Sequence, residues 1–227
     1  MSGPSSKPPP HPSPASRERE RVPRFIGVTR NARHPLSREA GEGEGGGADA
    51  AREASEDLLS FSFPPVARED ARALILGSLP GQASLKAQQY YVQPQNAFWP
   101  LMGELFGAGR DLPYAERLQR LQENRIALWD VCASACRPGS LDSDIDHDSV
   151  APNDFAALFR RCPRIKLVCF NGATAARLYH KLVTPTLKAE IATLRLPSTS
   201  PAHASRSFAQ KREAWAAALR SPRVEVL

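Results

Sequence analysis

The sequence Ala73-Leu-Ile-Leu76 runs directly into Gly77-Ser-Leu-Pro-Gly81, so an unbroken aliphatic run ends at a turn rich in Gly and Pro. A short run that is apolar throughout, rather than at every second position, is typical of a strand buried on both faces of a sheet. In an open α/β sheet, ligands bind just beyond the carboxyl ends of such strands. We therefore expect a buried parallel strand over 73–76 and a ligand-binding loop over 77–81.

The same pattern of a short apolar run and a helical stripe recurs along the chain. Further strands are predicted over 126–131, 165–170 and 190–196, and helices over 96–106, 113–124, 152–161, 173–182 and 206–219. Strands that alternate with helices form crossover units, which build a parallel sheet covered on both faces. The expected fold class is α/β, a three-layer α/β/α sandwich with a central, mainly parallel four-stranded sheet. The loops after the four strands should then meet at one edge.

The loop after the first strand is dense in aromatic and amide side chains. It includes Gln89-Tyr-Tyr-Val-Gln-Pro-Gln-Asn-Ala-Phe-Trp99. Its rings offer flat stacking faces, and the amide of Asn96 can both donate and accept hydrogen bonds. This chemistry suits a planar ligand with a polar edge, such as a nucleobase.

The composition changes sharply near residue 60. Roughly the first 65 residues hold about half of all Pro and Gly residues and few large aliphatic ones. Such a segment cannot bury enough apolar surface to offset the entropy of ordering it. We therefore expect a disordered low-complexity tail over 1–60 and one folded domain over 61–227. The charges of the tail nearly cancel, so the net charge of +6 belongs to the folded part.

A basic folded domain favours polyanionic partners, nucleic acid first, and a basic solvated surface without such a partner is the alternative. No apolar run approaches the ~18 residues of a membrane span, so we expect no membrane partner. The N-terminus lacks the apolar core of a secretory signal, which favours the cytoplasm, with import into an organelle as the alternative. The four cysteines lack the two close pairs of a metal site, so we expect no metal and no cofactor. With no heptad pattern in the sequence, we expect a monomer.

Taken together, the strand-end loops resemble the uracil-DNA glycosylase superfamily, and within it the hypoxanthine-DNA glycosylase family. The motifs that carry the resemblance are Gly77-Ser-Leu-Pro-Gly-Gln-Ala-Ser-Leu85, Gln89-Tyr-Tyr91, Pro94-Gln-Asn-Ala-Phe-Trp99, Leu128-Trp-Asp-Val131, Arg137-Pro-Gly-Ser-Leu-Asp-Ser143, Phe170-Asn-Gly172 and Leu196-Pro-Ser-Thr-Ser-Pro-Ala-His203. The resemblance implies a monofunctional enzyme that flips a deaminated base out of DNA, hypoxanthine first and uracil second. It would hydrolyse the N-glycosidic bond without a metal and leave an abasic site. The partner would be DNA that contains a deaminated base, and the protein would associate with a bacterial-type nucleoid.

The resemblance places Asn96 at the catalytic position of the hypoxanthine family. Its amide takes up no proton at neutral pH, but it can hold an attacking water or polarise the departing base. In the uracil branch a polar residue of the first loop activates the water, and here that position is Leu79, which offers no hydrogen bond. The water would therefore be held by Asn96. The alternative is that Asn96 serves only as a helix N-cap, a position that Asn favours.

The resemblance also implies a set of base-binding residues, namely Gly77, Ser78, Leu79, Tyr91, Phe98, Asp130 and Asn171. Tyr91 would stack on the flipped base, with packing at the edge of the core as the alternative. Asp130 would accept a hydrogen bond from the pairing edge, for example from N1–H of hypoxanthine. The alternative for Asp130 is a strand-end cap or an ion pair with Arg137, and for Asn171 it is an ordinary Asn-Gly turn.

The last loop supplies the expected DNA contacts, which are Ser198, Thr199, Ser200 and His203. Their side chains and nearby backbone N–H groups would hold phosphates, and a solvated loop residue is the alternative for His203. A hydrolase triad of Ser200, His203 and Asp130 is disfavoured because the chain lacks a nucleophile elbow. Two other classes remain open: a nucleic-acid-binding module of the same fold without the chemistry, and a small-molecule nucleotide hydrolase. The second is disfavoured because the sequence has no phosphate-binding Gly-rich loop.

Overall fold

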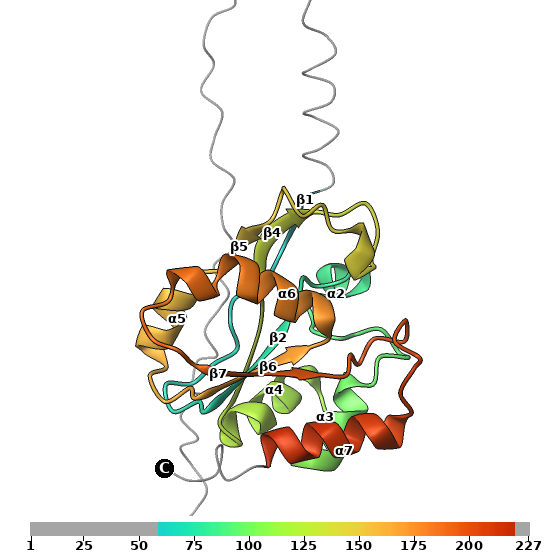
Figure 1. Ribbon diagram of the computed structural model, residues 1–227. Coiled ribbons are helices and arrows are strands. Elements are labelled where there is room, and N and C mark those ends of the chain that lie inside the picture. Colours follow the sequence, from blue (N-terminus) through green and yellow to red (C-terminus); the bar gives the residue numbers. More distant parts are fainter. Residues whose placement is uncertain (1–58, 221–227) are drawn as a thin grey trace, which may run out of the picture. The chain divides into compact units, whose positions relative to one another are not determined.

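The computed structural model describes residues 59–220. At its centre lies a sheet of four parallel strands in the order β3-β2-β6-β7 (Figure 1). The strands are β2 (Ala73–Gly77), β3 (Ile126–Asp130), β6 (Leu167–Asn171) and β7 (Ala192–Leu196). Gly77 is paired with Asp130, and Asn171 with Leu196, so the strands end at a common edge. The predicted α/β fold with a four-stranded parallel sheet is confirmed.

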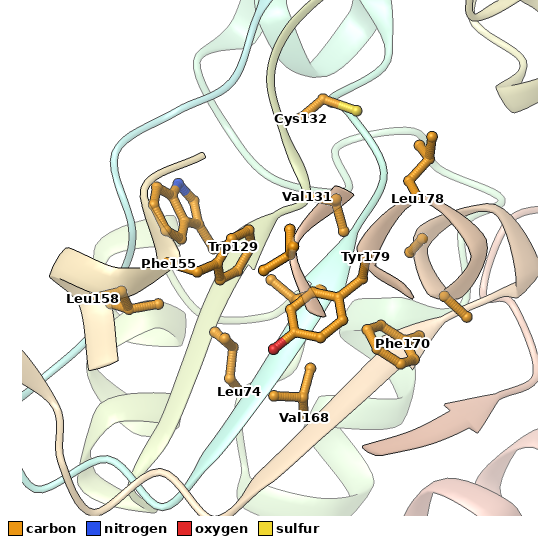
Figure 2. Close-up of a cluster of buried hydrophobic side chains, with 14 of the residues drawn as sticks. Leu74, Trp129, Val131, Cys132, Phe155, Leu158, Val168, Phe170, Leu178 and Tyr179 are labelled. Atoms are coloured by element: carbon orange, nitrogen blue, oxygen red, sulfur yellow. The ribbon is translucent and has the colours of Figure 1, made fainter. Parts of the chain in front are cut away.

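Successive residues of β2 point to opposite helix layers. Leu74 and Leu76 belong to one buried cluster, and Ala73 and Ile75 belong to the other. The helices over the first cluster are α5 (Phe155–Arg161) and α6 (Ala173–Leu182), and those over the second are α3 (Phe98–Phe106), α4 (Tyr114–Glu123) and α7 (Phe208–Leu219). Figure 1 shows the two layers on opposite sides of the sheet. In the first cluster, Leu74 of the sheet lies near Tyr179 of α6 (Figure 2).

A second sheet, which the sequence did not predict, extends beyond the end of β3. It has three antiparallel strands in the order β1-β4-β5. They are β1 (Leu59–Phe61), β4 (Cys132–Cys136) and β5 (Ala151–Pro152). Leu59 pairs with Cys136, so the folded part begins before the predicted boundary at residue 61. The rest of the predicted tail lies outside the described residues.

The ends of several helices follow from capping residues. Ser207 precedes α7 and forms a capping box with Gln210, in which each side chain accepts from the other residue's backbone N–H. Asp154 accepts from the N–H of Ala157 at the start of α5. Gly107 ends α3 with a φ of 67°, a left-handed conformation that glycine adopts without strain. The short α2 (Gln82–Ala87), η1 (Asp142–Asp144) and η2 (Thr184–Thr186) were not predicted.

Between residues 59 and 220, no helix is both long enough and apolar enough to cross a membrane. The same residues contain no group of three or more His, Cys, Asp or Glu side chains placed to hold a metal ion. The four cysteines form no disulfide within residues 59–220, and three of them are buried.

Candidate active site

The loops at the carboxyl ends of the parallel strands enclose a cavity of about 250 Å³. Most of the predicted site residues line it, namely Gly77, Ser78, Leu79, Tyr91, Asn96, Asp130, Asn171, Ser198, Thr199 and Ser200. Two predicted residues, Phe98 and His203, are not among the lining residues. The structure therefore brings the four loops together as the strand-end argument predicted.

Three groups meet at the end of β2. A Cβ atom added to Gly77 would lie 2.5 Å from Oδ1 of Asp130 and 3.1 Å from the hydroxyl oxygen of Tyr91. Any side chain at position 77 would therefore displace both groups. Glycine is needed here because the carboxyl of Asp130 approaches the end of the neighbouring strand so closely.

The ring of Tyr91 forms part of the cavity wall, with Phe98 behind it. The two rings are stacked, with centroids 4.1 Å apart and planes inclined by 24°. Phe98 is fully buried, so it supports Tyr91 from the core side and has no face in the cavity. Tyr91 has a φ of 53°, which is uncommon for a residue other than glycine. Burial and the nearby Asp130 raise the pKa of the Tyr91 hydroxyl well above its usual range, so that hydroxyl stays protonated.

The side chain of Asn96 has two roles. Its Oδ1 accepts a hydrogen bond from the backbone N–H of Phe98 at 3.0 Å, which satisfies one of the free amides at the start of α3. The N-cap position itself is held by Ala97, one residue later than the sequence suggested. Asn96 also lines the cavity. The amide is therefore fixed through its oxygen and offers its N–H groups to a ligand.

Asp130 is almost fully buried at the cavity floor. Its Oδ2 accepts a hydrogen bond from the hydroxyl of Ser62 at 3.0 Å. Burial raises the pKa of Asp130 to about 7, and the charge of Asp142 acts in the same direction. Ser62, Tyr90 and Arg137 act in the opposite direction. Asp130 is therefore present in both its neutral and its ionised form near neutral pH.

Within residues 59–220, Asp130 and Arg137 form no ion pair, so this alternative for Asp130 is wrong. The guanidinium of Arg137 instead donates to the carbonyl oxygens of Leu79, at 3.2 Å, and of Pro80. Arg137 is buried, so these carbonyls replace the water that the guanidinium loses on folding. The hydroxyl of Ser78 also donates to Asp142. The segment after β4 thus fixes the 77–81 loop, and the sequence showed no sign of this role apart from the motif over 137–143.

Asn171 and Thr199 join the two remaining loops. The Nδ2 of Asn171 donates to Oγ1 of Thr199 at 2.9 Å, and its Oδ1 accepts from the Thr199 N–H at 2.8 Å. Thr199 is buried, so its hydroxyl holds the Asn171 amide and does not face bulk solvent. Ser198 and Ser200 are half-buried and line the cavity mouth. His203 lies further along the loop, and its ring nitrogen is 3.4 Å from the hydroxyl of Ser205.

This arrangement of fold and cavity is that of a DNA glycosylase. The model of the uracil DNA glycosylase superfamily matches residues 64–220, and the chain belongs to this superfamily. It is 40% identical over 165 residues to a hypoxanthine DNA glycosylase of Methanosarcina acetivorans. The match covers 72% of this chain and 99% of that relative. It is 36% identical over 159 residues to a hypoxanthine DNA glycosylase of Methanosarcina barkeri, covering 70% of this chain and 96% of the relative.

A solved structure agrees with these relatives. The solution NMR structure of a candidate uracil DNA glycosylase from Methanosarcina acetivorans has a TM-score of 0.61 and 37% sequence identity to this chain. The match covers 74% of this chain and 99% of the solved one. The resemblance to the hypoxanthine-DNA glycosylase family is confirmed, and the protein is a monofunctional DNA glycosylase.

Proposed function

We propose that this glycosylase removes hypoxanthine from DNA, with uracil as a weaker second substrate. The relatives named as hypoxanthine DNA glycosylases support this substrate. The observation that carries the proposal is the meeting of Tyr91, Asn96 and Asp130 in one cavity. They supply a stacking face, an amide donor and a carboxyl acceptor, which is what a flipped purine with an N1–H requires.

Binding begins with extrusion of the damaged nucleotide. Flipping a base costs a few kcal/mol, and the cost is least for a weak pair such as one that contains a deaminated base. Stacking on an aromatic ring returns about 1–3 kcal/mol per base, which Tyr91 would contribute. Oδ1 of Asp130 would accept from N1–H, and the hydroxyls of Ser198 and Ser200 at the mouth would contact the DNA backbone.

The chemical step is hydrolysis of the bond between C1′ and the base. As this bond lengthens, positive charge develops on the sugar and negative charge on the base. Donors already in place toward the base lower the barrier, because they need no reorganisation during the reaction. Asn96 would hold the water whose oxygen bonds to C1′. One proton of the water passes, directly or through solvent, to the departing base, and the other stays on the new C1′ hydroxyl, which leaves a free base and an abasic site.

The experiment uses end-labelled duplexes that carry a single hypoxanthine, uracil or xanthine, followed by alkali to cleave abasic sites. We expect cleavage at hypoxanthine, and slower cleavage at uracil. Binding without cleavage would instead support a nucleic-acid-binding module that has lost the chemistry. Release of base from free nucleosides only would support a small-molecule hydrolase.

A further inference from the structure

Ser62 belongs to the chain segment that leads from β1 into the main sheet. Its backbone N–H donates to the carbonyl of Ala133 at 2.8 Å, which extends the pairing of β1 with β4. Its side chain donates to Oδ2 of Asp130, whereas Oδ1 is the carboxyl oxygen nearest to Gly77 at the end of β2. Ser62 precedes the part of the chain that the superfamily model matches, and it does not line the main cavity.

The hydroxyl of Ser62 has one hydrogen and two acceptors within reach. Oδ2 of Asp130 lies 3.0 Å from its oxygen, and the carbonyl oxygen of Phe63 lies 3.2 Å away. When Asp130 is ionised, Ser62 donates to Oδ2. When Asp130 is neutral, Ser62 can turn its hydrogen to Phe63 and accept the proton that sits on Oδ2. The same hydroxyl thus satisfies both forms of the carboxyl.

The two forms matter because both exist near neutral pH, where the pKa of Asp130 lies at about 7. Several titratable or charged groups lie near this carboxyl: Tyr90, Tyr91, Tyr114, Cys132, Arg137 and Asp142. Burial raises the pKa values of the three tyrosines and of the thiol, so these groups stay neutral across the physiological range. Asp130 therefore changes charge in a pH range where the tyrosines and the thiol stay neutral.

Oδ1 is the carboxyl oxygen nearest to Gly77, whereas Oδ2 accepts the hydrogen bond from Ser62. The hydroxyl of Tyr90 also interacts with this carboxyl and lowers its pKa. Gly77 and Asp130 both line the cavity, so Oδ1 is the oxygen that a ligand would meet. Hypoxanthine presents N1–H, a donor, whereas adenine presents an unprotonated N1, an acceptor. An Oδ1 without a proton therefore accepts from hypoxanthine and repels adenine, while an Oδ1 that carries the proton would do the reverse.

We propose that Ser62 is a specificity-determining positioning residue, which keeps the proton of neutral Asp130 on Oδ2 so that Oδ1 stays an acceptor in both forms. The enzyme then selects hypoxanthine over adenine on either side of the Asp130 transition. This inference rests on the proposed function, because it assumes that the pairing edge of the base faces Asp130. It assigns to the lead-in segment a part in substrate choice.

The test is Ser62→Ala in the full chain, compared with the wild type and with Ser62→Thr, which restores the hydroxyl. Ser60→Ala is the matched control, because Ser60 is a buried serine of β1 that makes no hydrogen bond to Asp130. Single-turnover excision is measured from about pH 5.5 to about pH 8.5 on duplexes that carry hypoxanthine or adenine at one position. The Asp130 carboxyl is titrated by NMR in parallel.

The wild type, Ser62→Thr and Ser60→Ala should keep their preference for hypoxanthine over the whole range. In Ser62→Ala, hypoxanthine excision should fall about tenfold below the Asp130 transition, and the ratio of hypoxanthine to adenine excision should fall with it. The NMR transition should move to higher pH, because Ser62 donates to the ionised form.

Two results would overturn the inference while the proposed function stands. One is a Ser62→Ala profile parallel to that of the wild type, and the other is a wild type that itself loses selectivity at low pH. A wild type that is inactive on hypoxanthine would overturn the proposed function and the inference with it. In that case, a shift of the Asp130 NMR transition in Ser62→Ala would still show that Ser62 hydrogen-bonds to Asp130, whatever the substrate is.

Discussion

Two loops that line the same cavity are held in different ways. The 77–81 loop is fixed by side chains from far along the chain: Arg137 binds its carbonyls and Asp142 accepts from Ser78. These contacts join residues that are 57 to 64 positions apart. Ser78 and Leu79 are buried as a result.

The 198–203 loop depends more on its own residues. The Ser198 hydroxyl accepts from the N–H of Ser200, and the Ser200 hydroxyl accepts from the N–H of Ala202, both over two positions in the sequence. Only Thr199 is buried in the centre of this loop, where it binds Asn171. The 77–81 loop is thus held by distant side chains and the 198–203 loop mainly by its own, which is the difference expected if the first binds the base and the second the DNA backbone.

The largest effect is expected at Asn96. This residue lies where the cavity meets the 198–203 loop, because the backbone N–H of the neighbouring Ala97 donates to the carbonyl of Thr199. Asn96→Ala should lower hypoxanthine excision about 100-fold or more, because a preorganised hydrogen-bonding group is lost from the reaction. DNA binding and circular dichroism should stay close to those of the wild type. The exposed neighbour provides the control, Gln95→Ala. Excision near the wild-type rate would remove Asn96 from the mechanism.

The second prediction concerns the 77–81 loop and the contacts of Arg137 with it. Arg137→Met should lower the free energy of unfolding by about 2–4 kcal/mol, because the carbonyls of Leu79 and Pro80 lose a buried charged donor. Urea unfolding measures this, with the exposed Arg206→Met as the control. An unchanged midpoint would mean that the loop keeps its shape without the guanidinium.

The third prediction concerns Thr199, whose hydrogen bonds with Asn171 join the 198–203 loop to the end of β6. Thr199→Val removes the hydroxyl that holds the Asn171 amide and should destabilise the fold by about 1–2 kcal/mol. Excision should fall more than DNA binding, since the affected amide lies at the base. Thr193→Val on the exposed edge strand β7 is the control. If binding falls and excision of bound DNA does not, Thr199 serves the backbone contact instead.

The smallest effect is expected at Ser200. Ser200→Ala should change the free energy of unfolding by less than about 0.5 kcal/mol, because its contact is local and half-exposed. DNA affinity should fall about two- to tenfold, which is the loss of one neutral hydrogen bond. The salt dependence of binding should not change, because a hydroxyl releases no counterion. Loss of stability comparable to that of Arg137→Met would contradict the difference between the loops.

The parallel sheet could be predicted because its strands are aliphatic runs that carry their signal locally. The second sheet could not, because β4 is Cys-Ala-Ser-Ala-Cys and β5 has two residues, with no apolar alternation. These strands form because β4 follows directly from β3 and finds β1 beside it. That pairing joins segments more than sixty residues apart, which no local pattern reports.

The site residues likewise fall into those that a local pattern could predict and those that it could not. Gly77, Asp130 and Asn171 were predicted because each stands at a strand end, and strand ends meet. The placement of Phe98 behind Tyr91 was not predicted, since the start of a helix does not reveal which side faces the core. The roles of Ser62 and Arg137 depend on single contacts across the fold, and only the motif that contains Arg137 could have drawn attention to it.

The orientation of the Asn96 amide depends on the formation of a helix. The oxygen of Asn96 is bound by the first amide of α3, so the group that would hold water is oriented only after that helix has formed. A nascent or partly unfolded chain would lack this orientation. Its basic surface could still meet DNA, yet it would break no glycosidic bonds.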